Sequence, residues 1–351
     1  NNYNKWMFGA VLYNSLLPRK HFEFELMPLY SYSTNDLAGY GHLAYTFYPD
    51  GPVFQHIQFG FVGARYAQTN NPFYMNFNKI APELAIEFKK KKSTGHFTNT
   101  LKYRNITIIQ DIDRQKFENN GVTHSRVSTT SNFNDLTYTL AKRDAITPYS
   151  ISINMQQGEN MCKAGLTAKY SYHFRKKNKG VDLRFFAGTF IGTNLTDGGP
   201  YRFRLSGQRG YQDYLYDHVY LGRTETNGLL ANQFTETDGG FKFYSPVGQS
   251  AKGLVALNIK SSLGNMKLPV NLYADLGTVA DDGILKQKVL YNAGVSVSIA
   301  KDVFEIFFPL LLSDDFNTYK KTNKLEYIET VRFTLNLKLM NPFDLLRNFT
   351  L

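Results

Sequence analysis

The chain has 351 residues, enough for two ordinary domains or one large all-β unit, and its 42% hydrophobic content is below what a helical membrane protein needs. The longest apolar run, residues 306–312, is too short to cross a membrane as a helix and is interrupted by Pro309. The formal net charge of +11 is consistent with binding to nucleic acid, with contact to anionic lipid head groups or with a basic channel lining. The charge alone does not distinguish these three possibilities.

Residue usage narrows the class further. The 24 Tyr, 28 Phe and 1 Trp are typical of β-strands and of the aromatic girdles of membrane barrels. The single cysteine, Cys162, excludes an intramolecular disulfide framework and a four-cysteine metal site. The first residues lack the basic and apolar regions of a signal peptide, so we expect any export signal to be removed or to lie upstream.

Alternation of apolar and polar residues with a period of two predicts strands along most of the chain. The clearest case is residues 331–339, where Val331, Phe333 and Leu335 share one face and Arg332 and Thr334 the other. The predicted strands cover residues 5–14, 21–31, 38–48, 53–67, 78–90, 97–111, 122–131, 135–143, 148–158, 163–174, 181–192, 252–262, 269–279, 289–299, 303–311 and 329–339.

Sixteen strands of about ten residues predict a 16-stranded antiparallel transmembrane β-barrel over residues 1–339, followed by a C-terminal tail of residues 340–351. A pair of soluble sandwiches is the first alternative; a propeller is the second, but it should show a repeated blade motif, and none is found. Because lipid cannot satisfy backbone groups, the first and last strands are expected to close on each other. The apolar faces then contact lipid and the polar faces line a lumen.

A long connection, residues 193–251, interrupts this pattern and contains the stretch Arg209-Gly210-Tyr211. Its length and its Tyr and Gly content indicate a functional, ordered loop. Long loops of outer-membrane barrels lie outside the cell and short turns in the periplasm. Residues 67–78 and 110–121 fit that rule poorly, since the predicted order of strands places both connections on the periplasmic side although both are long.

A lumen-facing carboxylate follows two strands later. In "LPVNLYADLGTV", Leu272 and Leu276 take the lipid face, so Tyr273 and Asp275 face the lumen. A carboxylate buried there needs a cation.

These elements resemble the Omp85 superfamily, the outer-membrane assembly and two-partner secretion barrels of the BamA, TamA and FhaC type. The resemblance implies that a sixth extracellular loop folds into the lumen and that Arg209, with Gly210 and Tyr211 at the loop tip, pairs with Asp275 in its Asp-x-Gly context, Asp275 to Gly277. A guanidinium can grip a carboxylate with two parallel hydrogen bonds, which suits such a lock.

Three features depart from that family. No periplasmic POTRA repeats precede Trp6, and about eleven residues follow the last predicted strand. The stretches "KWMFGAVLYNSLLP" and "GYQDYLYDHVYLGR" are similar to Bacteroidetes-type barrels that carry a fused enzyme domain, including M1-type metallopeptidases.

No catalytic chemistry is expected from this chain. HExxH, paired CxxC, GxSxG and Walker motifs are absent, and His21 lacks a second histidine four residues on, so we expect no catalytic residue, metal site or cofactor. Nucleic acid is not expected as a partner, because the aromatic residues alternate with aliphatic ones on the face opposite the charges.

Three functions remain open for a protein of the bacterial outer membrane. The first is insertion or translocation of polypeptides through a lateral seam, whose residues would be Trp6, Phe8, Val11, Val331, Phe333 and Leu335. The second is a plugged anchor or export module for a fused or partner enzyme domain, and the third is a passive diffusion pore. The expected partners are outer-membrane lipid and lipopolysaccharide, a client polypeptide, and periplasmic or lipoprotein chains.

Overall fold

The protein is described by a computed structural model over residues 2–14, 20–89, 97–118, 121–174, 179–193, 196–263, 269–281, 284–285, 288–300 and 302–336. The predicted tail, residues 340–351, and the end of the last predicted strand lie outside these residues. The first half contains β1 Met7–Gly9, β2 Leu12–Tyr13, β3 Phe22–Ser31, β4 Asp36–Phe47, β5 Phe54–Thr69, β6 Met75–Phe88, β7 Phe97–Glu118, β8 Gly121–Lys142, β9 Tyr149–Gln157, β10 Met161–His173 and β11 Gly180–Thr193. The second half contains η1 Thr196–Tyr201, β12 Phe203–Arg204, η2 Gly210–Gln212, η3 Leu229–Asn232, β13 Gln249–Ser250, β14 Gly253–Ser262, β15 Val270–Asp281, β16 Ile284–Leu285, β17 Leu290–Ala300, β18 Phe304–Leu312, α1 Asp314–Thr322, α2 Tyr327–Thr330 and β19 Arg332–Leu335.

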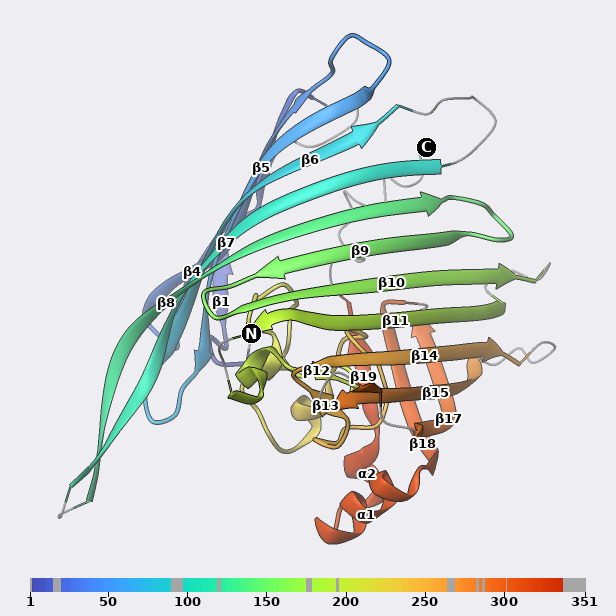
Figure 1. Cartoon of the computed structure of the whole chain (residues 1–351). Coiled ribbons are helices and arrows are strands. Elements are labelled where there is room, and N and C mark those ends of the chain that lie inside the picture. The colour runs from blue at the N-terminus through green and yellow to red at the C-terminus, as the bar shows by residue number, and fades with distance from the viewer. Residues whose placement is uncertain are drawn as a thin grey trace.

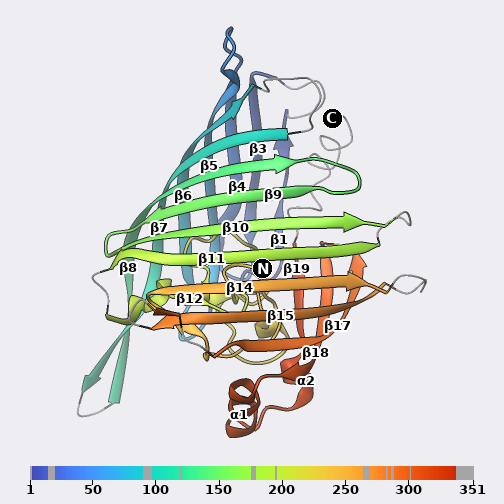
Figure 2. The ribbon, with the colours of Figure 1, turned by 45° about the vertical axis from the view of Figure 1, so that its right-hand side comes forward.

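One curved antiparallel sheet of 17 strands makes up most of the fold. Its strands lie side by side nearly in chain order, as Figures 1 and 2 show, with β11 next to β14 and β15 next to β17. The segment between β11 and β14 lies on the concave side of the sheet (Figure 1). The chain is therefore all-β, as predicted.

The two faces of the sheet follow the predicted alternation. On β15, Leu272 and Leu276 are 48% and 40% exposed, whereas Tyr273 and Asp275 between them are buried. On β19, Arg332 and Thr334 lie opposite Phe307 and Glu305 of β18 on the concave face. Apolar side chains therefore cover the outside, while the inward face carries the polar side chains together with the buried apolar ones that pack against the segment between β11 and β14, such as Leu254 and Val279.

Two predicted strands, residues 122–131 and 135–143, are in fact the single strand β8. The Asn-rich stretch between them looks like a turn in sequence, but Asn132 and Asn134 hydrogen-bond across the ladder to Thr107 and Asn105, at 2.8 and 3.0 Å. Pairing with β7 continues from Phe97 to Glu118, well past the predicted end of that strand. Residues 110–121 are thus mostly a hairpin arm and not a long turn.

This correction removes one strand before the long connection and places the connections after β5 and β7 at the same end of the sheet as the two longest ones, after β11 and β18. The connections after β5, β7, β11 and β18 all leave from that end, because successive strands run antiparallel. The connection after β18, which falls between the predicted strands 303–311 and 329–339, forms α1 and α2. The acidic residues Asp314 and Asp315 begin α1, and Lys320 and Lys321 end it, matching the helix dipole.

The expected closed barrel is not formed within the described residues. No pairing joins β1 or β2 to β19; β1 and β2 pair with β3, and β19 pairs with β18. The first strand is broken at residues 10–11, and β19 has four residues. The predicted count of sixteen strands is not reproduced in this part of the chain. No helix among the described residues is long and apolar enough to span a bilayer.

Candidate functional site: the inward loop

Residues 196–252, called the inward loop from here on, are held together mostly without regular secondary structure. The pair β12–β13 joins its two ends, and Leu205 donates its backbone N–H to the Gly248 carbonyl at 2.9 Å. Phe241 in turn donates to the Leu205 carbonyl at 2.8 Å. These backbone bonds hold the two ends of the loop together.

An apolar cluster fixes the loop against β11, β14 and β15. Leu205 and Phe241 are fully buried, and the cluster joins them to sheet and helix residues. Gly277 of β15 lies beneath them, since a Cβ there would meet the Leu205 side chain at 2.5 Å. Phe316 of α1 covers the other side and lies 6.1 Å from Phe241, measured between ring centroids. Helix α1, in the connection after β18, therefore packs against the loop and helps to hold it in place.

The predicted lock between Arg209 and Asp275 is replaced by a different pair. Asp275 is fully buried and accepts hydrogen bonds from the backbone and Nζ of Lys242, both at 3.1 Å. Asn258 and Asn292 complete its shell at 2.8 and 2.9 Å. The carboxylate does pair with a cation of the loop, as its inward position demands, but the cation is Lys242.

Arg209 instead stacks on an aromatic ring. Its guanidinium lies 3.4 Å from the ring centroid of Tyr244, and one nitrogen contacts the Thr226 carbonyl at 3.4 Å. Burial lowers the pKa of Arg209 from its ordinary value. Tyr211 is bonded to Tyr244 through the two hydroxyls, at 2.7 Å. The arginine therefore organises the loop internally and leaves Asp275 to another residue.

Gly210 is required by close packing at this tip. A Cβ on it would come within 2.5 Å of the Arg223 carbonyl oxygen. Arg223 itself pairs with Asp213 at 3.1 Å and lies over the Tyr216 ring. The tip is thus folded back on its own loop.

A second ionic contact ties the loop to the opposite part of the sheet. Asp217 accepts hydrogen bonds from Arg104 of β7 at 2.8 and 3.0 Å and from Lys79 of β6. Burial alone would raise the pKa of the Asp217 carboxyl, but these two cations outweigh burial and hold it well below its usual range. Arg104 also bonds Asp135 of β8. The loop is therefore clamped at two separate places, by Lys242 and by Asp217.

The last strand is bonded to the loop as well. Arg332, 1% exposed, donates to the carbonyls of Phe241 and Gly207 at 3.2 and 3.0 Å. The backbone N–H of Phe234 donates to the Phe333 carbonyl at 2.9 Å, and Gln233 forms a parallel bridge with Phe333. The side of β19 that does not pair with β18 is therefore partly occupied by the inward loop.

The residues predicted for a lateral seam lie at the two ends of the sheet. Trp6, Phe8 and Val11 are 85%, 74% and 47% exposed, beside β1 and β2. Phe333 and Leu335 are half-buried on β19, and Val331 precedes that strand. No backbone pairing joins the two groups in the described residues.

Sequence reasoning missed Lys242, Asp217 and Arg332. The stretch "GGFKFYS" held a signal for the first, since Phe241, Lys242 and Phe243 alternate in the manner of a strand that places a cation between two apolar residues. Asp217 gave no such signal, because its partners Lys79 and Arg104 come from distant strands. Among the described residues, no group of three or more His, Cys, Asp or Glu side chains is arranged to hold a metal ion.

No family model matches the sequence, and no curated protein matches it. Among solved structures, CdiB from Acinetobacter baumannii is similar with a TM-score of 0.37 and 12% identity, over 84% of this chain and 51% of that one. BamA from Haemophilus ducreyi, in a structure that lacks POTRA domains 1-3, is similar with a TM-score of 0.39 and 8% identity, over 88% of this chain and 72% of that one. The chain thus spans about half the length of the CdiB structure.

Proposed function

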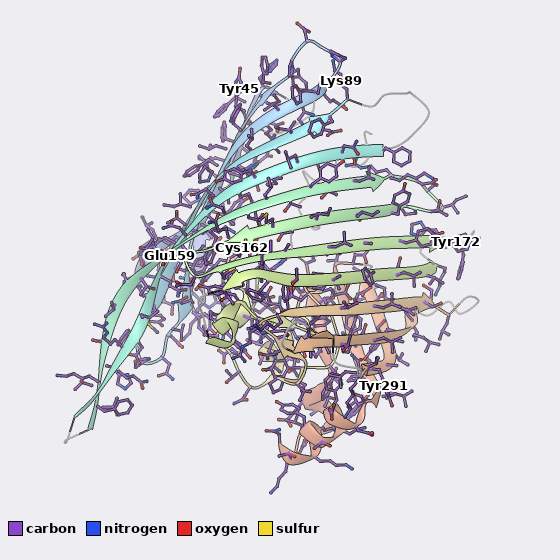
Figure 3. All side chains as sticks on the ribbon, viewed as in Figure 1. Tyr45, Lys89, Glu159, Cys162, Tyr172 and Tyr291 are labelled. Atoms are coloured by element: carbon purple, nitrogen blue, oxygen red, sulfur yellow. The ribbon has the colours of Figure 1, made fainter. Side chains whose placement is uncertain are left out.

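We propose that the protein is an Omp85-type outer-membrane protein that inserts or translocates polypeptides at the edge between its first and last strands. The distribution of side chains supports the membrane location. Phe59, Ile153 and Leu272 are 56%, 52% and 48% exposed on three separate strands, while Asp275 and Arg332 are buried on the inward face. Figure 3 labels three more outward residues, Tyr45, Tyr172 and Tyr291. A water-soluble sheet would bury its large apolar residues, whereas lipid favours them outside.

The observation that carries the proposal is the short length and incomplete pairing of β19. This strand has four residues, pairs with β18 on one side, and is bonded on the other side to the inward loop through Phe333. Lipid offers no hydrogen bonds to a strand edge, so such an edge favours any extended chain that can add to it. A client strand that adds to β19 would take the place of residues 233–234 of the loop.

The test is a covalent link between the two ends of the sheet. In a Cys162→Ser background, Phe8→Cys and Phe333→Cys are joined by a bismaleimide, and the protein is reconstituted in liposomes. We expect the link to stop folding of an added barrel precursor, measured by its heat-modifiable mobility, because a client strand can no longer enter between the first strands and β19. Each single-cysteine variant should remain active.

The matched control is a link across a continuous ladder. Leu276 and Tyr291 are paired residues of β15 and β17, 40% and 43% exposed on the outside, and their cysteine variants accept the same reagent. This control link should leave precursor folding unchanged. If the Phe8–Phe333 link also leaves it unchanged, the edge mechanism is wrong.

A second candidate function is a plugged anchor for a fused or partner enzyme domain. The two ionic clamps and the Arg332 contacts favour it, because they hold the inward loop firmly against the sheet. The same crosslink separates the two functions. An anchor should give no precursor folding with or without the link, whereas an insertion protein should fold the precursor without the link and fail to do so with it.

A further inference from the structure

A cavity of about 380 Å³ lies between the inward loop and the concave face of β9, β10 and β11. Lys163 of β10, which follows Cys162 (labelled in Figure 3), lines it from the sheet together with Arg184 of β11. Arg204 lines it from the loop. One water occupies roughly 30 Å³ of liquid, so the cavity has room for a solute.

These three cations are buried without a carboxylate partner. Lys163, Arg184 and Arg204 are 9%, 7% and 9% exposed. None of them forms an ion pair of 4 Å or less with any carboxylate of the described residues. A buried cation without an anionic partner is costly, and neighbouring cations repel each other. Lys163 and Arg204 are close enough for that repulsion to act between them.

The partners they do have are neutral. The Lys163 ammonium donates to the Tyr201 carbonyl at 3.2 Å and lies about 5 Å from two ring centroids. Arg204 donates to two backbone carbonyls, and Arg184 donates to the Asn258 side chain at 2.9 Å. The Nε of Arg184 and that of Arg204 are buried with no hydrogen-bond partner. The positive charge at the cavity is therefore left uncompensated by these contacts.

The carboxylates that share the cavity are mostly committed to other cations. Asp213 pairs with Arg223 at 3.1 Å, Asp217 with Arg104 at 2.8 Å, and Glu236 with Lys242 at 3.0 Å. The fourth, Asp238, lies within electrostatic range of Lys163 and Arg204 but forms no ion pair of 4 Å or less with either. Glu236 and Asp275 share the single cation Lys242, and Arg184 lies within electrostatic range of both, so it is partly balanced. Lys163 and Arg204 are left with Asp238 as the one carboxylate lining the cavity that has no ion pair of its own within the described residues.

We infer that this cavity binds a phosphate-type oxyanion. Two guanidiniums and one ammonium reach the same space from β10, β11 and the loop, which suits a tetrahedral anion with several acceptor oxygens. The anion bonds both the sheet and the loop, so its binding also strengthens loop docking. The inference does not rest on the proposed function, since an anchor and a translocation protein could use the site alike.

The experiment measures anion binding to the full chain in two settings. In detergent, inorganic phosphate is added at constant ionic strength against sodium chloride, and binding is followed by calorimetry and by the midpoint of thermal unfolding. In nanodiscs, phosphatidic acid is compared with phosphatidylcholine alone, because a lipid phosphate carries the same chemistry as the free anion. The variants are Lys163→Gln and Arg204→Gln, and the control is Lys288→Gln, which changes an exposed lysine bound to Asp315.

We expect phosphate, free or on the lipid, to raise the unfolding midpoint of the unaltered protein and of the Lys288→Gln variant. Affinity should fall about tenfold to a hundredfold in each cavity variant, the loss that follows from removing one charge-assisted hydrogen bond. Without phosphate, the cavity variants should unfold no earlier than the unaltered protein, because each has lost an uncompensated buried charge. The inference is overturned if neither source of phosphate binds, or if the cavity variants bind as well as the control.

Discussion

Asp275 and Lys242 form the buried ion pair that decides how the inward loop is held. Asp275 is fully buried and Lys242 is 3% exposed. The inward direction of the Asp275 side chain could be predicted, because Leu272 and Leu276 lie on the opposite face of the same strand and are expected to face lipid. Its partner could not, since the short alternation at residues 241–243 marks Lys242 as an inward cation without saying which carboxylate it meets, and only the folded path of the loop decides whether Lys242 or Arg209 reaches Asp275. The alternation and the desolvation of the carboxylate predict a buried cation beside Asp275, and the structure has Lys242 there in place of the Arg209 that the resemblance implies.

Replacing Lys242 with Met should weaken loop docking by about 3–5 kcal/mol, because it leaves the Asp275 carboxylate buried without a cation. Arg209→Met should cost less, about 1–2 kcal/mol, since it removes a stacking contact with Tyr244. Urea unfolding in detergent and protease cleavage within residues 196–252 measure both effects. Lys252→Met, at an exposed lysine of the same loop, is the control.

Removing both charges provides a sharper check of this pair. In Lys242→Met combined with Asp275→Leu, the unpaired buried carboxylate of Asp275 is gone, and Glu236, which also loses its cation, is 36% exposed and can be solvated, so much of the lost stability should return. A double variant as unstable as Lys242→Met alone would show that the loss came from packing and not from the unpaired carboxylate.

Asp217 should make loop docking sensitive to acid. Its pKa is lowered in the folded protein by Lys79 and Arg104, so its contribution is fully present above the pKa of an unfolded aspartate, about 4. That contribution is lost as the pH falls below this value toward the lowered pKa. We expect protease cleavage of the loop to rise as the pH drops through this range, using a protease active in acid. In Asp217→Asn, cleavage should already be higher at pH 7 and should change less with pH, and an identical pH profile in the two proteins would contradict the role of this carboxyl.

At the scale of elements, α1 and β8 show what alternation can and cannot reveal. The alternation predicts two strands in place of the continuous strand β8 because Asn132, Asn134 and Asp135 are residues typical of turns. Asn105 and Thr107, which donate hydrogen bonds to Asn134 and Asn132, lie on β7. The sequence of β8 alone therefore does not show that the strand continues through these residues. Helix α1 carries charges suited to its dipole at both ends, but its role depends on Phe316, whose partners Phe241 and Phe243 lie over seventy residues earlier.

Phe316→Ala should loosen the inward loop without disturbing the sheet. The change leaves a cavity beside Phe241 and Phe243 and should cost about 3–5 kcal/mol. Faster protease cleavage within residues 196–252, with unchanged heat-modifiable mobility of the sheet, is the expected outcome. Ile328→Ala on α2, at a side chain 67% exposed, is the control from the same connection. Equal cleavage in both variants would mean that α1 does not hold the loop.

At the scale of the whole molecule, the sheet gathers its longest connections at one end and places one of them along its concave face. The all-β class and the two-faced strands could be predicted, because each strand carries its own alternation. Closure could not, since it depends on the meeting of two segments at opposite ends of the chain. In the described residues, the side of β19 that does not pair with β18 accepts a backbone hydrogen bond from Phe234 of the loop. This contact joins two segments whose sequences share no periodicity.

That backbone contact determines which client strands could bind at the edge in the proposed function. Residues 233–234 and an incoming client strand compete for the same carbonyl of Phe333, and the loop competes as a tethered ligand whose effective concentration is on the order of millimolar. A short or weakly pairing segment would therefore be rejected, whereas a strand able to form several ladder bonds at once would displace the loop. The inward loop would then act as an intramolecular competitive inhibitor that sets the minimum length of β-strand the edge accepts.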